Sequence, residues 1–142
     1  MKMGWAMVCL AINIALATTT AAASPEYSRA YESCMVRAQS ADPLMTDCAN
    51  EETDRQDAAL NTAYRTLMGK LTGDAKAALL ASERAWVTYR DTECRFEGSQ
   101  EEGGTAEHVI YSGCVLQLTY RRVELLRDRL KADRINGPAD GH

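Results

Sequence analysis

The feature that most constrains this chain is the placement of its cysteines. The five are Cys9, Cys34, Cys48, Cys94 and Cys114. The second and third flank a turn signal at residues 40–43, and the last two flank a glycine-rich segment at residues 98–104. If the chain is exported and Cys9 is removed with a signal peptide, the four cysteines that remain are an even number, which indicates disulfide bonds. A bridge across each of these turns would hold the chain in two hairpins.

Residues 1–23 have the pattern of an export signal. Lys2 is the only charged residue in them, and an apolar run at 6–17 leads into three alanines at 21–23. A charged start, a short apolar stretch and an A-x-A-like site predict a signal peptide cleaved before Ser24. We therefore expect a periplasmic or secreted protein that keeps four cysteines. An apolar run of about 12 residues is too short for a bilayer core that needs roughly 20, so we expect no membrane anchor after cleavage.

The composition argues against several classes of protein. With 46% apolar and 25% charged residues, the chain fits one globular domain, which we place at residues 24–135. A net charge of -4, with no basic cluster longer than Arg121 and Arg122, argues against nucleic-acid binding. The cysteines lack the spacing of a metal site, and neither His108 nor His142 is placed to complete one. Neither histidine is a plausible catalytic partner for a serine or cysteine nucleophile. We expect no metal, no cofactor and no enzymatic activity.

Apolar residues recur at helical spacing along most of the chain, and no useful stretch alternates with the period of a strand. Pro25 opens the first expected helix, Asp42 is the expected N-cap of the second, and Thr105 is the expected cap of the fourth. The expected helices cover residues 24–39, 42–72, 74–98 and 105–132. This pattern predicts an all-α domain of about four helices in antiparallel hairpins, with a flexible tail at residues 136–142.

Four cysteines allow three disulfide connectivities, and their spacing alone does not choose among them. We favour the local pairs Cys34–Cys48 and Cys94–Cys114, because each of them would staple one helical hairpin. In the chain-entropy model, closing loops of about 15 and 21 residues stabilises a fold by roughly 3 kcal/mol each. Both bridges are expected to be structural rather than catalytic.

Several motifs follow one another along the chain. They are Met45-x-x-Cys48, Asp57-x-x-Leu60-Asn61-x-x-Tyr64-x-x-Leu67-Met68, Glu83-Arg84-Ala85-Trp86-Val87-x-Tyr89-Arg90-Asp91-x-x-Cys94, Gly103-Gly104-Thr105, Cys114 and Leu118-Thr119-x-x-Arg122. Together they resemble the family of lysozyme-inhibitor LprI-like domains, over about residues 31–130. The stretch from Trp86 to Cys94 is the most specific part. Glu83 stands where this family usually has Gln, and Thr105 where it usually has Ser.

The resemblance implies a small exported helical domain of bacteria, in a family whose founding member inhibits lysozyme. We therefore expect a protein that acts by binding another protein, with a basic lysozyme as the first candidate partner. Such an inhibitor would protect the bacterial cell wall. The alternative is a periplasmic interaction or envelope-stress module with no glycosidase target, because membership of a family does not fix activity.

Polar residues of these motifs are expected to fix the register of neighbouring helices. Asp57 and Asn61 lie four residues apart and so share one helix face. Arg84 and Asp91 lie seven apart on the next helix, and Arg90 is close to both. Guanidinium and carboxylate groups on neighbouring helices can pair and hydrogen-bond only when the helices are aligned in one register, which favours a structural network. The alternative is that these side chains contact a ligand or partner directly.

The aromatic residues of the motifs are expected in the core. We expect Trp86 to be a core anchor and Tyr64 to be buried with its hydroxyl hydrogen-bonded. Arg122 belongs with the polar set, because it closes the last motif. In the third expected helix, one broad apolar stripe contains Leu79, Trp86, Tyr89 and Phe96.

The glycine-rich segment is the candidate partner-binding surface. Glu97, Glu101 and Glu102 lie in or beside it. A bridge at its base would lower the cost of ordering the loop on binding, and its charge would steer a basic lysozyme. The alternatives are a solvated connector, or a geometry in which Arg95 enters the carboxylate cleft of a glycosidase.

The signal peptide and the disulfides give a first testable prediction. The intact mass of the exported protein should match a chain that begins near Ser24 and has no free thiol. The measurement is mass spectrometry of the native protein after treatment with a thiol-alkylating reagent. Two or more alkylated cysteines would contradict the disulfide assignment.

Overall fold

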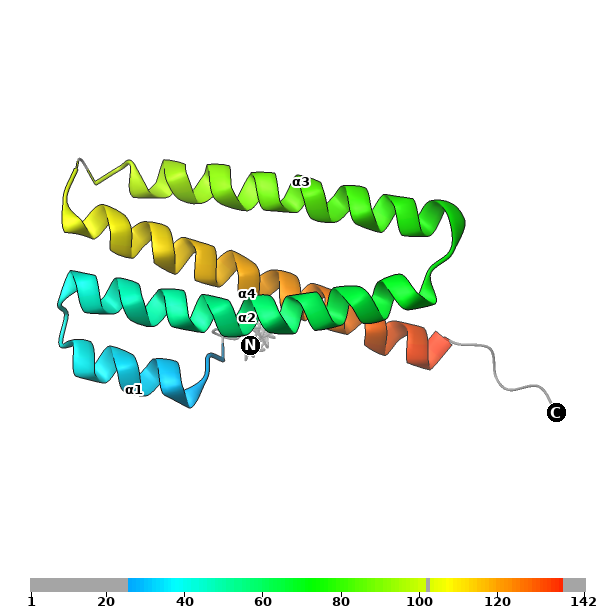
Figure 1. Ribbon diagram of the computed structural model, residues 1–142, viewed down its shortest axis with the longest axis horizontal. Coiled ribbons are helices and arrows are strands. Elements are labelled where there is room, and N and C mark those ends of the chain that lie inside the picture. Colours follow the sequence, from blue (N-terminus) through cyan, green and yellow to red (C-terminus); the bar gives the residue numbers. More distant parts are fainter. Residues whose placement is uncertain (1–25, 102, 137–142) are drawn as a thin grey trace, which may run out of the picture.

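The computed structural model describes residues 26–101 and 103–136, and these form four α-helices (Figure 1). The helices are α1 (Arg29–Ala38), α2 (Asp42–Lys70), α3 (Gly73–Gly98) and α4 (Thr105–Asn136). No strand occurs in this part of the chain. The all-α prediction is therefore confirmed. The expected signal peptide at residues 1–23 lies outside the described residues. Of the tail expected at residues 136–142, only Asn136 is described, and it belongs to α4.

Three long helices run antiparallel to their neighbours in sequence, and the short α1 lies along α2 (Figure 1). Helix α4 packs against both α2 and α3, and α1 packs against α2. The α1–α2 turn and the α3–α4 loop lie at the same end of the molecule, at the left of Figure 1. The predicted helical hairpins are therefore both present.

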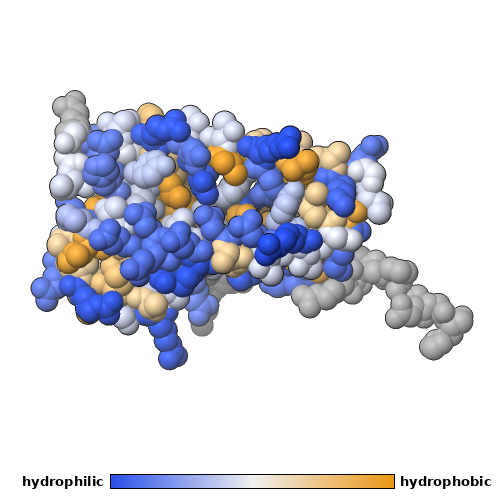
Figure 2. Space-filling model, in the orientation of Figure 1, coloured by the Kyte–Doolittle hydropathy of each residue, from blue (hydrophilic) through white to orange (hydrophobic). Residues whose placement is uncertain are grey.

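The core lies mainly between α2 and α4. Leu60, Ala63 and Leu67 of α2 pack against Val123 and Leu126 of α4, and all five are buried. The α2 residues recur at spacings of three and four, so they form one stripe along the helix. The face shown in Figure 2 is mostly hydrophilic, with apolar residues in small separate patches. The buried apolar cluster thus lies in this two-helix seam.

Helix α3 buries fewer of its residues than α2 does. Only Cys94 and Gly98 of its residues are buried. Trp86 and Leu79 do pack against the core, but Tyr89 is 52% and Phe96 58% exposed. The expectation that these four residues act as one stripe was wrong. Three residues rotate a helix by about 300°, so Tyr89 lies only about 60° around α3 from Trp86, and the strip of α3 that packs against the core is narrower than this.

Several helix ends also differ from the prediction. Helix α1 begins at Arg29, where Ser28 is the N-cap and its Oγ accepts a hydrogen bond from the Tyr31 backbone N–H at 3.2 Å. Helix α4 continues to Asn136. Asp42 lies inside α2, and Ala41 is the N-cap. The side chains expected as two separate caps bond each other instead, because the Thr105 hydroxyl donates to the Asp42 carboxylate at 2.5 Å.

Both predicted disulfides are present. Cys34–Cys48 joins α1 to α2 with its Cα atoms 5.7 Å apart, and Cys94–Cys114 joins α3 to α4 with its Cα atoms 5.4 Å apart. These separations are typical of disulfides. Each bridge spans one hairpin near its turn, so the local pairing is confirmed.

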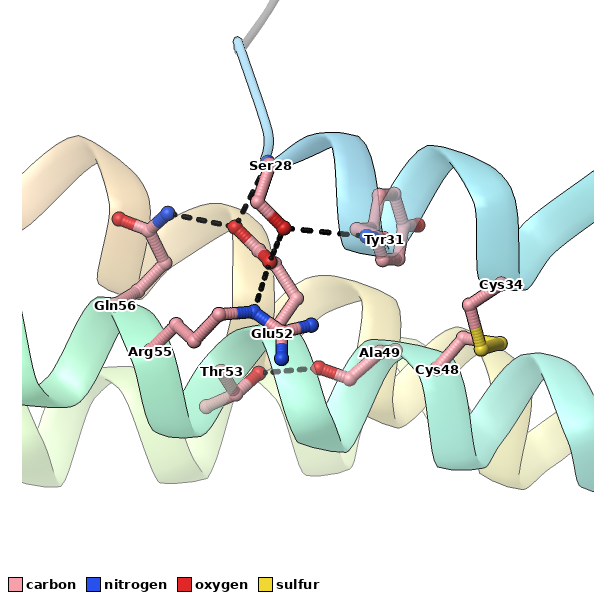
Figure 3. A network of polar contacts seen from close by, with 9 residues as sticks. All are labelled: Ser28, Tyr31, Cys34, Cys48, Ala49, Glu52, Thr53, Arg55 and Gln56. Atoms are coloured by element: carbon pink, nitrogen blue, oxygen red, sulfur yellow. Dashed lines mark hydrogen bonds and ion pairs between the residues drawn. A yellow bond between two sulfur atoms is a disulfide. The ribbon is translucent and has the colours of Figure 1, made fainter.

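A buried carboxylate, absent from the sequence predictions, ties α1 to α2 (Figure 3). Glu52 is fully buried. The Ser28 hydroxyl donates to its Oε2 at 2.5 Å and the Ser28 backbone N–H donates to its Oε1 at 3.1 Å. Arg55 Nε donates to Oε2 at 2.7 Å and Gln56 Nε2 donates to Oε1 at 2.9 Å. Glu52 therefore anchors the very residue that caps α1.

These contacts decide the charge state of the carboxylate. Burial alone raises the pKa of Glu52, but the hydrogen bonds from Ser28, Arg55 and Gln56 outweigh it and hold the pKa below its usual range. A carboxylate with a depressed pKa stabilises the fold above its unfolded-state pKa of about 4.3. This stabilisation is lost as the pH falls through the lower pKa of the folded state.

We predict that Glu52→Gln lowers the free energy of unfolding by about 2 kcal/mol at neutral pH, because an amide NH2 group then faces a buried donor. The variant should also lose stability less steeply than wild type below about pH 4. Denaturant unfolding at several pH values tests both effects. Glu51→Gln is the matched control, because Glu51 is exposed on the same helix. Equal loss of stability in both variants would contradict the assignment.

Candidate functional site

The family-type motifs of α2, α3 and α4 meet around the indole ring of Trp86. The guanidinium carbon Cζ of Arg90, one turn further along α3, lies 5.1 Å from the ring centroid. Cζ of Arg122, from α4, lies 5.8 Å from it. Both distances are within the range of cation–π attraction. Trp86 also packs against the α2–α4 core, so the expected core anchor holds two cations as well.

Arg122 ties α4 to α3 through the most enclosed ion pair of this cluster. Its Nε and Nη2 donate to Glu83 Oε1 at 3.0 and 2.6 Å, and Nη2 also donates to Ser82 Oγ at 2.9 Å. The side chains of Arg122 and Glu83 are only 11% and 12% exposed. Because little water reaches the pair, it specifies one alignment of the two helices. Sequence reasoning included Arg122 but did not pair it with Glu83, which lies 39 residues away.

Arg90 links the three long helices. Its guanidinium lies 2.9 Å from Asp91 Oδ1 and 3.8 Å from Asp57 Oδ1 of α2. Its Nη1 also donates to Thr119 Oγ1 of α4 at 3.4 Å. Burial raises the pKa of Asp57 above its ordinary value, and the charge of Arg90 offsets this only in part.

Three other residues expected in this network lie outside it. Asn61 is exposed and donates from Nδ2 to the backbone oxygen of Asp57 at 2.9 Å. Arg84 is exposed and makes no ion pair with any residue of the described ranges. Tyr64 packs against the core, but its hydroxyl makes no hydrogen bond within the same ranges. An i, i+4 spacing puts side chains on one face without requiring that they bond.

These outlying residues line a groove between α2 and α3. The groove has a volume of about 520 Å³ and is lined by Leu60, Asn61, Tyr64, Glu83, Arg84, Trp86, Val87 and Thr88. It exists because α3 leans on α4 rather than inserting fully against α2. The motif thus divides into a part that holds the helices together and a part that faces this groove.

The α3–α4 loop forms a second candidate site, which we name the acidic end and define by Glu97 and Glu101. Both side chains are exposed, and the Cys94–Cys114 bridge lies at the base of the loop. Glu102 lies outside the described residues. The loop base is tightly packed, because a Cβ added at Gly98 would lie 3.2 Å from the backbone oxygen of Glu107. The Asp42–Thr105 hydrogen bond adds a link from α2 to this end.

The described residues contain neither a metal-binding cluster nor a helix that could span a membrane. No group of three or more His, Cys, Asp or Glu side chains in these ranges is arranged to hold a metal ion. None of the helices in those ranges is both long and apolar enough to cross a membrane.

The difference in exposure between the ion pairs gives a stability prediction. Arg122→Ala should lower the free energy of unfolding by about 2 to 4 kcal/mol, because it leaves Glu83 unpaired and nearly buried. Arg90→Ala should cost only about 1 kcal/mol, because its acidic partners are partly solvated. Arg84→Ala should change stability by less than about 0.5 kcal/mol. Chemical denaturation of the three variants tests this ranking, and a larger loss for Arg84→Ala than for Arg122→Ala would overturn it.

Comparisons with known proteins agree with the motif resemblance. The family described as "Lysozyme inhibitor LprI" matches residues 34–126. An uncharacterized protein, R02472, of Rhizobium meliloti (strain 1021) is 33% identical over an alignment of 98 residues, and the match covers 60% of this chain and 70% of that protein. No solved structure matches the chain. The family match covers both disulfides, the Trp86 cluster and most of the core, and the chain belongs to the LprI lysozyme inhibitor family.

Proposed function

We propose that this protein is an exported, non-catalytic inhibitor that binds a basic lysozyme and so protects the bacterial cell wall, in the periplasm or outside the cell. Family membership supports inhibition of lysozyme in general. The two disulfides fit an oxidising compartment. Within this proposal, the negative charge of the acidic end attracts the lysozyme.

The observation that carries this claim is the rigid mounting of exposed carboxylates. Glu97 precedes the buried Gly98, and Glu101 follows it within three residues. The disulfide and the close approach at Gly98 hold the loop base in place. A preorganised loop loses little conformational entropy on binding. Negative charge at such a position accelerates encounter with a positively charged enzyme.

The groove between α2 and α3 is a less suitable binding site for a basic lysozyme than the acidic end. Its lining is largely apolar and includes the cation Arg84, which a basic lysozyme would repel. The interaction module without a glycosidase target remains the function favoured if no lysozyme is inhibited. The test therefore begins by titrating the purified mature protein into lysozymes of several types and measuring lysis of cell walls.

Replacement of Glu97, Glu101 and Glu102 together by Gln should slow association with a basic lysozyme several-fold. The dissociation rate should change much less than the association rate, and the dependence of the association rate on salt should become shallower. Surface charges act over a Debye length of about 8 Å at physiological ionic strength, so they mainly alter the encounter rate. Surface-binding kinetics at two salt concentrations measure both quantities.

A charge-matched control is the triple variant with Glu32→Gln, Asp74→Asn and Asp128→Asn, all exposed sites away from the loop. This variant changes net charge equally, so it should slow association less. If both triple variants bind with the same rate, the local role of the acidic end is refuted. A thermal melt of each variant verifies folding.

A further inference from the structure

Helix α3 carries an aromatic face that the described residues leave largely exposed. We define the tyrosine face as Tyr89, Glu93 and Phe96, which lie at positions i, i+4 and i+7 and so project from one side of the helix. Both aromatic rings are more than half exposed, and Phe96 is the only phenylalanine of the chain. Exposed aromatic residues beside charge are typical of protein interfaces.

A groove of about 510 Å³ lies beside this face, between α3 and α4. Tyr89, Glu93 and Glu97 line it from α3, and Gln117 and Arg121 line it from α4. Tyr27 also lines it, and the remaining lining residues all belong to α4.

The Tyr27 ring is held by edge-to-face contacts. Its centroid lies 5.0 Å from that of Tyr31 and 5.5 Å from that of Tyr120. The groove is therefore lined by two aromatic side chains, Tyr27 and Tyr89.

The carboxylates of the groove are free to receive a cation. Glu93 is half-buried and Glu97 is exposed, and neither makes an ion pair with a residue of the described ranges. The Cys94–Cys114 bridge sets the antiparallel register of the two helices. In this register Glu93 and Glu97 lie near the bridge, whereas Arg121 lies about two turns away toward Tyr89. The acidic part of the groove thus continues directly into the acidic end.

We propose that the tyrosine face and its groove are the contact surface for the inhibited lysozyme, and that the groove receives a lysine or arginine side chain of that enzyme. This inference rests on the proposed function and names its contact site. Aromatic rings and carboxylates together favour a cationic side chain, through cation–π attraction and ion pairing. A second copy of this chain is a poorer occupant, because two such faces would oppose their carboxylates.

The two acidic regions then have different roles. Glu101 lies on the loop outside the groove and acts before contact, through its long-range field. Tyr89, Glu93 and Phe96 act after contact, because they are covered in the complex. Removing a covered side chain mainly raises the dissociation rate, whereas removing a rim charge mainly lowers the association rate.

The test compares dissociation rates from a lysozyme that the wild-type protein inhibits. The double variant Tyr89→Ala with Phe96→Ala should weaken binding at least tenfold, mainly through faster dissociation. Glu93→Gln should also dissociate faster, and Tyr89→Phe should bind nearly as wild type because it keeps the ring. Leu125→Ala is the matched control, because Leu125 is an exposed apolar residue on α4.

Each outcome bears on one claim. If wild type inhibits no lysozyme, the proposed function fails and this inference fails with it. If wild type inhibits but the double variant dissociates at the same rate, only this inference is overturned. Light scattering is the further measurement, because a wild-type dimer that the double variant converts to monomer would assign the face to self-association and overturn the inference. Faster dissociation of the double variant, with unchanged mass and an unchanged Leu125→Ala control, supports it.

Discussion

The ion pair between Arg122 and Glu83 fixes the position of helix α3, and every candidate surface of this protein includes residues of that helix or of the loop that follows it. Helix α3 buries only Cys94 and Gly98, both near its C-terminal end. Hydrophobic burial therefore contributes less to the placement of α3 than to the α2–α4 seam. The ion pair and the Trp86 ring fix the middle of α3, and the disulfide fixes its end. A helix attached along one narrow seam keeps its other faces free for a partner.

Much of the fold followed from the sequence. Cysteines flanking two turn signals predicted the hairpins, and helical spacing of Leu60, Tyr64 and Leu67 predicted the buried side of α2. Both signals are local, so they can be read without knowing the tertiary arrangement. The ends of helices were less predictable, because Asp42 and Thr105 bond each other across a separation of 63 residues. Sequence shows a polar residue near the expected start of a helix, but not whether its side chain bonds the helix backbone or a distant group.

The candidate site was predicted only in part for a related reason. Asp57 of α2 and Asp91 of α3 both lie beside the guanidinium group of Arg90, which bears a charge of opposite sign. Periodicity could not show that Tyr89 and Phe96 are exposed, since exposure depends on how many helices surround α3. Glu52 carried no signal at all, because nothing in a sequence marks a glutamate as buried.

Helix α3 is thus held in place by one face and leaves another face exposed. Side chains that point from α3 toward α4 hold the helix, and side chains about a quarter-turn away remain open beside the acidic end. The most direct test of this account is hydrogen–deuterium exchange of the protein with and without a basic lysozyme that it inhibits. If lysozyme binds at the tyrosine face and the acidic end, exchange should slow in the C-terminal half of α3 and the first turns of α4, with little change in the middle of α2. Protection centred instead on residues 58–64 of α2 would contradict it and assign binding to the groove between α2 and α3.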